Sequence, residues 1–437
     1  MMKPYPRYNQ SSARWYSSFP ETWSEVKAKR LFSNERERAS SEDEQLAASQ
    51  KYGVIPQALM MAQNNAKVML ALKGTDNFKQ VKENDFVISL RSFEGGIEHS
   101  KYNGCISPAY TVLRLRHESS NPNYFRYALK CSPFIQALNS TSEGIRDGKT
   151  ITYDEFGELL VALPNQAEQK AIATFLDRET QRIDSLIEEK QTFIKLLKEK
   201  RQALISHVVT KGLNPNVEMQ DSGIEWIGQV PKHWEVKKIK HICSNFMYGT
   251  SQDCNQSDVG YPVLRIPNIK STNVDFEDLK YANISDVDAL TYLLSRGDIL
   301  VIRTNGNPNL VGQSALFDSN GQYLFASYLI KLTPKRGVDT SFLVEAMNSL
   351  SVRQALTFQS RTSVGNYNLS IPSLANTSIA IPPIDEQKTI TNYLSAATIN
   401  IDLLIQETDK SIDLLKEHRT SLISAAVTGK IDVREAV

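Results

Sequence analysis

Five polar segments of this chain carry side chains that often contact DNA bases. They occupy residues 91–104, 141–149, 247–252, 303–314 and 359–368 and are rich in Arg, Asn, Gln, Ser and Tyr. Arg can donate two hydrogen bonds to guanine, Asn and Gln can pair with adenine, and Lys positions phosphates. One such segment alone is more typical of a solvated loop, but five together favour nucleic-acid binding. The candidate contacts, including one beside these segments, are Arg91, Ser92, Lys101, Asn103, Arg146, Lys149, Tyr248, Thr250, Arg265, Arg303, Asn305, Asn307, Arg361, Ser363, Asn366 and Tyr367.

Three short motifs resemble parts of catalytic sites, and each lacks something that its chemistry requires. Residues 144–150 (GIRDGKT) approach a phosphate-binding loop but are one residue too short between the glycine and Gly-Lys. Residues 121–124 (NPNY) lack the second proline of the methyltransferase motif and a glycine-rich cofactor turn. Glu168 and Glu386 match half of a nuclease site, yet both fall in a first helical turn, where the helix dipole favours glutamate. The sequence therefore predicts turns, a helix start and a chain without catalytic residues.

Composition limits the possible functions further. The chain has 437 residues and a formal net charge of +1, so any surface for nucleic acid must be local. No apolar run is long enough to span a membrane and no signal-peptide pattern is present, so we expect a cytoplasmic protein without membrane association. The four cysteines form no Cys-x-x-Cys pair. His233, His241, Cys243 and Cys254 match no standard zinc spacing, so no metal site is predicted.

The elements that must position the polar segments include a repeat. Residues 163–213 and 381–431 align without a gap, and nearly half of their positions are identical. Apolar residues recur in a seven-residue pattern in both copies, which predicts two helices that pair as an antiparallel coiled coil. Asn165 with Glu168 suits a helix start and Gly212 a helix end, and about 45 residues would make a helix roughly 68 Å long. The predicted seam is Ile172, Leu176, Ile183, Ile187, Ile194, Leu197, Leu204 and Val208, with Ile390, Leu394, Ile401, Ile405, Ile412, Leu415, Leu422 and Ala426.

Weaker echoes extend the repeat into the rest of the chain. They predict an α+β fold with two globular segments in a pseudo-twofold repeat, 1–162 and 214–380, separated by the antiparallel helices of 163–213 and 381–437. Between the echoes, residues 34–82 and 253–298 differ almost completely. The echoes pair 19–33 with 230–244 (with a one-residue gap after Trp23), 83–91 with 296–304, 105–115 with 324–332, and 148–164 with 365–382.

Several of these stretches resemble one known family. The helix openings LPNQAEQKAIATFLD and IPPIDEQKTI, the segment DSGIEWIGQVPKHWEVKKIKHI and the segment GDILVIRTNGNPNLVG are similar to the specificity subunit of Type I restriction–modification enzymes. The resemblance covers most of the chain. It implies two target-recognition domains, residues 15–162 and 226–380, with the repeated helices between them.

The resemblance also implies a function and partners. Each recognition domain would read one half of a bipartite, asymmetric target in double-stranded DNA, and the helices would set the spacing and dock two methyltransferase subunits. Adenine methylation and ATP-dependent cleavage, with S-adenosylmethionine, ATP and Mg²⁺, would belong to partner methyltransferase and restriction–translocase subunits, leaving this chain non-catalytic and without cofactors. Candidate docking positions outside the seam are Phe175, Leu186, Phe193, Leu196, Tyr393, Leu404 and Leu414.

Two other classes of function stay open from the sequence. A protein-binding dimerisation scaffold would use the same helices without reading DNA. A self-contained nuclease or methyltransferase would need the catalytic motifs that are missing above. If the helices act as a ruler, inserting about one helical turn after Lys190 should widen the spacer without changing either half-site.

Overall fold

The computed structural model describes residues 3–40, 42–64, 77–88, 97–141, 151–256, 259–363 and 365–435, with backbone only at 63–64, 141 and 363. The chain divides into two compact units. Residues 1–190 with 410–437 form the first unit, and residues 191–409 form the second. Each unit contains one globular segment and part of each long helix.

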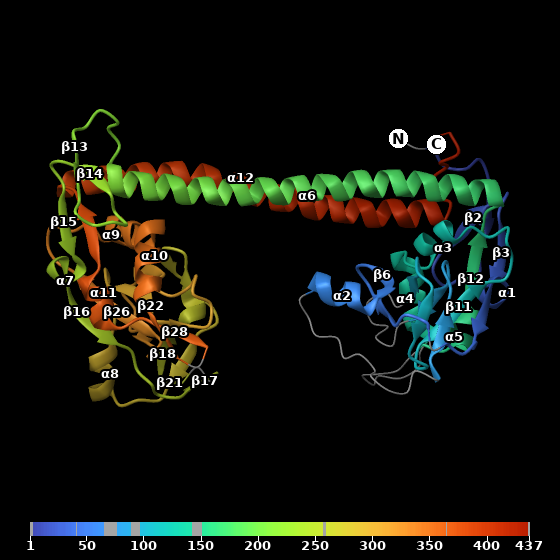
Figure 1. Ribbon diagram of the computed structural model, residues 1–437, viewed down its shortest axis with the longest axis horizontal. Coiled ribbons are helices and arrows are strands. Elements are labelled where there is room, and N and C mark those ends of the chain that lie inside the picture. The colour runs from blue at the N-terminus through green and yellow to red at the C-terminus, as the bar shows by residue number, and fades with distance from the viewer. Residues whose placement is uncertain are drawn as a thin grey trace. The chain divides into compact units, whose positions relative to one another are not determined.

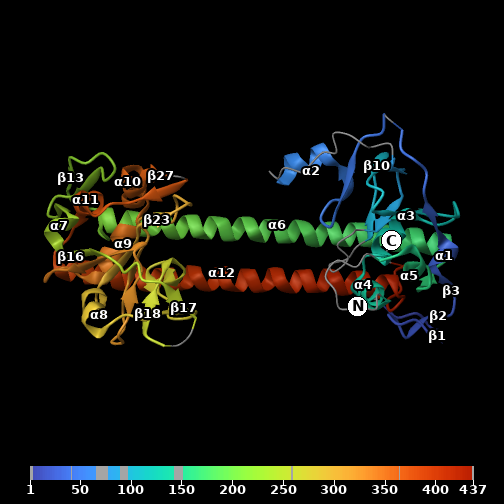
Figure 2. The ribbon, with the colours of Figure 1, turned by 90° about the horizontal axis from the view of Figure 1, so that it is seen from below.

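The two predicted long helices are present, and they pair antiparallel within each unit. Helix α6 spans Gln166–Lys211 and helix α12 spans Ile384–Val427. In the first unit the start of α6 lies beside the end of α12, and in the second unit the end of α6 lies beside the start of α12 (Figures 1 and 2). Ile172, Leu176 and Ile183 are almost fully buried, as are Ile390 and Leu394. The heptad prediction is confirmed, with Ile187, Leu204, Ile405, Leu415 and Leu422 only partly buried.

The helix ends follow from their residues. Asn165 Oδ1 accepts a hydrogen bond from the Glu168 backbone N–H at 3.0 Å, which satisfies one of the free donors of the first turn of α6. Gly212 ends that helix with a φ of 75°, a conformation that glycine adopts without a steric cost. The predicted start and stop of this helix are confirmed.

The globular part of the first unit is built on a four-stranded sheet in the order β4-β11-β8-β9, with helices α3 and α4 against it. Smaller pairs of strands surround this sheet (Figure 1). The described strands of this globular part are β1 (Tyr8–Gln10), β2 (Ser18–Pro20), β3 (Ser24–Lys27), β4 (Phe32–Glu35), β5 (Leu46–Ser49), β6 (Gly53–Pro56), β7 (Lys79–Val81), β8 (Phe86–Ile88), β9 (Ile97–His99), β10 (Gly104–Ile106), β11 (Thr111–Leu115) and β12 (Leu160–Leu163). Its helices are α1 (Ala28–Leu31), α2 (Gln57–Asn64), α3 (Pro122–Ala128), α4 (Ser132–Thr141) and α5 (Tyr153–Gly157).

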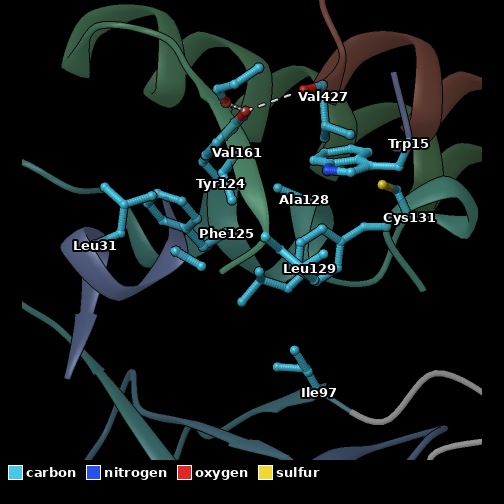
Figure 3. Packing of buried hydrophobic residues seen from close by; sticks show 14 of the residues in the cluster. Trp15, Leu31, Ile97, Tyr124, Phe125, Ala128, Leu129, Cys131, Val161 and Val427 are labelled. Carbon is cyan, nitrogen blue, oxygen red and sulfur yellow. Dashed lines mark hydrogen bonds between the residues drawn. The ribbon is translucent and has the colours of Figure 1, made fainter. Parts of the chain in front are cut away.

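One aromatic core joins this sheet to the long helices. Tyr124 is fully buried, and its hydroxyl lies within hydrogen-bond distance of the Ala162 carbonyl at 3.2 Å and the Val427 carbonyl at 3.3 Å. Figure 3 shows Tyr124 next to Val427, with Trp15 on the other side of that residue. The same cluster contains the start of α6 and the end of α12, so the globular segment and the helix ends share one core.

The globular part of the second unit repeats this plan with a larger sheet, β16-β26-β22-β24-β20-β19. A second sheet, β17-β21-β18-β25, and helices α9 to α11 complete it. Its strands include β13 (Met219–Asp221), β14 (Gln229–Pro231), β15 (Glu235–Lys238), β16 (Cys243–Tyr248), β17 (Cys254–Asn255), β18 (Tyr261–Leu264), β19 (Ile269–Lys270), β20 (Asn273–Val274), β21 (Lys280–Ala282), β22 (Ile299–Ile302), β24 (Ser314–Leu316), β25 (Leu324–Phe325), β26 (Leu329–Pro334) and β29 (Ser378–Ile381). Its helices are α7 (Ile239–Ile242), α8 (Asp286–Tyr292), α9 (Thr340–Asn348), α10 (Leu350–Gln359) and α11 (Ile371–Asn376).

The similar segments that the sequence pairs between the two halves form equivalent strands in the two units, and these strands are called the frame. Asp85 and Asp298 are both buried at the start of a central strand, and each accepts a backbone N–H three residues before it. The segments between the echoes pack in smaller hydrophobic clusters that they share with the central strands of each unit. Leu46, Val54 and Val81 belong to one in the first unit, and Leu264 and Phe317 belong to one in the second. The predicted α+β fold with two repeated globular segments is confirmed.

The gap expected after Trp23 is wrong. Strand β3 pairs with β12 so that Lys27 lies opposite Leu160, and β15 pairs with β29 so that Lys238 lies opposite Ser378. Leu160 and Ser378 are equivalent in the gapless helix repeat, so Lys27 corresponds to Lys238 without a missing residue. The gap followed from aligning the identical Val-Lys residues of the two segments. The register of a strand is instead fixed by its pairing and by which of its residues are buried.

Candidate nucleic-acid interface

Two of the polar segments, far apart in the sequence, meet in one small sheet of the second unit (Figure 2). Strand β23 (Thr304–Asn305) pairs with β28 (Asn366–Asn368), which pairs with β27 (Arg361–Ser363), all antiparallel. The register places Arg361 and Thr304 opposite Asn368. Segments 303–314 and 359–368 therefore form one surface.

The residues of this sheet divide between its two faces. Because neighbouring residues of a strand point to opposite sides, Arg361, Asn366 and Asn368 belong to one face, and Asn305 and Tyr367 to the other. Tyr367 packs against the buried core of the unit, whereas Arg361 and Asn366 are exposed. The outer face thus presents a guanidinium and carboxamides, the groups that read guanine and adenine.

The side chains of Arg303 and Tyr248 pack beside this sheet and do not project from its outer face. The Arg303 guanidinium lies over the Tyr248 ring at 4.3 Å, a cation–π contact, and both side chains are half-buried. The Tyr248 hydroxyl accepts the Ile371 backbone N–H at 3.0 Å, and the Arg303 carbonyl accepts that of Leu369 at 2.9 Å. These contacts join the ends of β16 and β22 to the start of α11.

Asn305 and Asn307 shape the loop that follows β23. Asn305 Oδ1 accepts the Asn307 backbone N–H at 2.8 Å, and Asn307 Oδ1 accepts that of Asn309 at 3.0 Å. Such side-chain turns fix the backbone locally. Their oxygens are therefore engaged, and the remaining polar group of each carboxamide is its NH₂ donor.

Thr250 and Arg265 both form contacts within the unit. Thr250 is only 4% exposed, and its backbone N–H donates to the Phe325 carbonyl at 2.8 Å. Arg265 donates to the Asp278 carbonyl at 2.8 Å. The prediction that Thr250 contacts DNA directly is wrong because the chain crosses close to Phe325 there. Arg265 contacts the Asp278 loop, and its contact with DNA stays a prediction.

Fewer of the predicted DNA-contacting residues lie in the described part of the first unit than in that of the second. Lys101 is exposed after β9. Asn103 Oδ1 accepts the Glu83 backbone N–H at 2.8 Å and so holds a turn. Of Ser363 in the second unit, only the backbone is described. Four further candidates lie outside the described residues: Arg91, Ser92, Arg146 and Lys149. The whole phosphate-loop-like segment 144–150 also lies outside the described residues.

The predicted docking positions separate into two groups. Phe175 is fully buried in the core of the first unit, so its assignment to an exposed surface is wrong. It faces the globular segment that packs on the start of α6, a contact that helix periodicity alone does not show. The other six are between 36% and 65% exposed on the long helices: Leu186, Phe193, Leu196, Tyr393, Leu404 and Leu414.

The two catalytic-looking motifs that lie in the described part of the chain have structural roles. Asn121 caps α3 by accepting the Asn123 backbone N–H at 2.9 Å, and Tyr124 belongs to the core. Glu168 is buried and accepts the Tyr5 hydroxyl at 2.7 Å, while Glu386 pairs with His233 at 2.8 Å. Within the described residues, no three His, Cys, Asp or Glu side chains gather as a metal site. No helix in that part of the chain is long and apolar enough to cross a membrane.

The comparison with known families agrees with this architecture. The profile of the family described as "Type I restriction modification DNA specificity domain" matches residues 20–196 and 231–412. The chain belongs to this family. The two matched ranges each contain one globular segment and the first part of the long helix that follows it.

Individual members of the specificity family are distant in sequence. The EcoKI specificity subunit of Escherichia coli K12 is 24% identical over 70% of this chain and 65% of its own length. The putative MjaX specificity subunit of Methanocaldococcus jannaschii is 26% identical over 46% of this chain and 47% of its own. The chain thus spans 65% and 47% of the lengths of these two relatives. The MjaVIII specificity subunit of the same organism is 22% identical over 81% of this chain and 80% of its own length.

Solved structures share the fold. A chain from a study titled "Structural basis underlying complex assembly and conformational transition of the type I R-M system" has a TM-score of 0.72 at 14% identity. The match covers 94% of this chain and 99% of that one. The HsdS subunit of Thermoanaerobacter tengcongensis has a TM-score of 0.53 at 15% identity, covering 95% and 99%.

Proposed function

We propose that this chain is the DNA-reading specificity subunit of a Type I restriction–modification complex and has no catalytic activity itself. The observation that carries the proposal is the outer face of the β23-β28-β27 sheet, with exposed Arg361 and Asn366. A protein scaffold has no need for several base-reading side chains on one small sheet. Membership in the specificity family supports the same function.

Each unit would read one half of a bipartite target. The two frames are equivalent, but the segments inserted in them differ, so the two half-sites should differ in sequence. The exposed apolar residues of α6 and α12 would dock two methyltransferase subunits, and restriction–translocase subunits would join through that assembly. S-adenosylmethionine, ATP and Mg²⁺ would act in those partners. Because methylation requires a base to leave the duplex, the catalytic pocket would belong to the methyltransferase.

Methylome sequencing tests this function. A host without adenine methylation would receive a cognate methyltransferase subunit, with or without this chain. We expect a bipartite, asymmetric adenine-methylated motif only when the chain is present. An assembled complex that yields no new motif would contradict the proposal and favour a protein-binding scaffold.

A further inference from the structure

The first unit contains an open cavity of about 410 Å³ where its sheet meets the helices. Gly53 in the β5–β6 hairpin makes a close approach possible, since a Cβ there would lie 2.6 Å from the His99 carbonyl oxygen. The hairpin is thereby held against β9, with Lys51 at its turn. Basic residues from four parts of the unit line the cavity: Lys51, Lys101, Arg126, Lys130 and Arg419.

Three of these cations are neutralised by single carboxylates. Lys130 pairs with the buried Glu98 at 2.7 Å. Arg126 pairs with Asp177, and Arg419 pairs with Asp184. Lys51 and Lys101 are exposed, and neither forms an ion pair with a carboxylate in the described part of the chain. The cavity therefore has uncompensated positive charge from two lysines.

His99 responds to this environment. Burial, together with the positive charges of Arg126 and Lys101, lowers the pKa of His99 to about 4. The imidazole is neutral at physiological pH, and its Nε2 lies 3.2 Å from Asn84 Oδ1. The smaller, electrostatic part of this shift comes from the positive charges of Arg126 and Lys101 beside the cavity.

The second unit has a cavity in the corresponding place with a different lining. Its volume is about 780 Å³, and Asn348 occupies the position that Lys130 has in the repeat. The long helix contributes Gln202 to it, whereas α12 contributes Arg419 to the first. Carboxamides thus dominate the polar part of this lining, and Arg353 is its basic residue. The cationic lining is a property of the first unit.

We propose that the cationic cavity of the first unit binds backbone phosphates of DNA and positions the duplex without reading its sequence. This inference rests on the proposed function and deepens it. Phosphate contacts fix the register of a protein on the duplex, and each one adds to the salt dependence of the affinity. The first unit should therefore supply more of that salt dependence than its amide-lined counterpart.

The test uses the assembled complex of this chain with its methyltransferase subunits and a duplex containing the methylated motif. Affinity is measured over a range of salt concentrations for the wild type and for a Lys51→Gln, Lys101→Gln double variant. Each lost phosphate contact should reduce the slope of log K against log salt by about 0.9, so the slope should fall by about 1.8. The methylated motif should stay the same, because no base contact changes.

Two variants serve as controls. Lys27→Gln with Lys29→Gln removes the same charge from the first unit at exposed lysines that pair with Glu158, and the slope should not change. Lys51→Arg with Lys101→Arg keeps the charge and should keep the slope. An unchanged slope in the glutamine variant, with specific binding by the wild type, would overturn the phosphate site alone. A wild-type assembly that binds no DNA specifically would overturn the proposed function and this inference with it.

Discussion

Arg419 of α12 donates two hydrogen bonds to Asp184 of α6, at 2.9 and 3.2 Å. The second unit contains the same contact in reverse, from Arg201 of α6 to Asp402 of α12 at 3.1 Å. The four residues occupy equivalent positions of the two repeat copies. One type of contact therefore joins the two helices in both units.

These ion pairs should specify helix register more than they stabilise the fold. Asp184 and Arg419 are both more than a third exposed, so solvent screening should limit their coupling to about 1 kcal/mol or less. A double-mutant cycle with Asp184→Ala and Arg419→Ala, followed by denaturant unfolding, measures it. A coupling energy above about 2 kcal/mol would show that the pair acts as a buried one.

Gln387 should matter more for stability than these charges. It is almost fully buried at the start of α12, accepts the Asp339 backbone N–H at 2.8 Å and donates to the Pro382 carbonyl at 2.8 Å. Gln387→Ala leaves both partners unsatisfied and should cost about 1–3 kcal/mol for each. Hydrogen exchange should show the loss of protection in the second unit, with exposed Gln220→Ala as the unaffected control. Equal protection in both variants would contradict this role.

Arg361 should determine part of one half-site. We expect Arg361→Ala to relax the methylated motif at one base pair of one half-site and to leave the other half-site unchanged. Loss of a two-bond contact to a base costs about 1–3 kcal/mol in discrimination. Arg336→Ala, an exposed arginine of the same unit, is the matched control, and methylome sequencing compares the two. A motif unchanged in both variants would remove Arg361 from the interface.

Exposed leucines on the long helices should serve assembly, not folding. Leu196→Lys and Leu414→Lys should weaken binding to the methyltransferase subunit, measured by calorimetry, and leave the unfolding midpoint unchanged. Leu290→Lys changes an equally exposed leucine on α8 and should leave both quantities unchanged. Phe175→Ala should instead cost about 3–5 kcal/mol of stability because its ring is in the core. Normal assembly by both helix variants would place docking elsewhere.

The long helices should set the spacing of the half-sites. Inserting seven residues after Lys190 and seven before Lys410 keeps the heptad phase of both helices. Each helix then gains about 10 Å, so the methylated motif should gain about three base pairs of spacer and keep its half-sites. A matched four-residue insertion breaks the seam phase and should reduce assembly. An unchanged spacer in the seven-residue variant would exclude the ruler.

Sequence alone predicted the parts of the fold that repeat. Two copies of the same pattern identified the helices, their seam and the frame strands, because burial imposes periodicity on both copies. Phe175 was misplaced because its burial depends on a globular segment packed against α6, which the helix period does not contain. The one-residue gap after Trp23 failed for a similar reason, since strand pairing fixes the register there.

The candidate interface was less predictable. Composition identified Arg361 and Asn366, but it did not separate them from Thr250, which is buried by a chain crossing. The cations of the first cavity come from a hairpin, a strand end and two helices, and no local pattern connects them. The reciprocal Arg and Asp pairs were detectable, since the same residue types recur at the same offset in both copies.

The separate hydrophobic clusters have an evolutionary consequence. Leu46, Val54 and Val81 pack in a small cluster of their own, apart from the aromatic core that contains Tyr124. A substitution or insertion among the divergent strands therefore disturbs this cluster, including its contacts with Val87 of β8 and Val112 of β11, and leaves the aromatic core intact. Natural selection can alter what each half binds while the way each half folds stays constant, and two copies of one ancestral unit can acquire unrelated preferences.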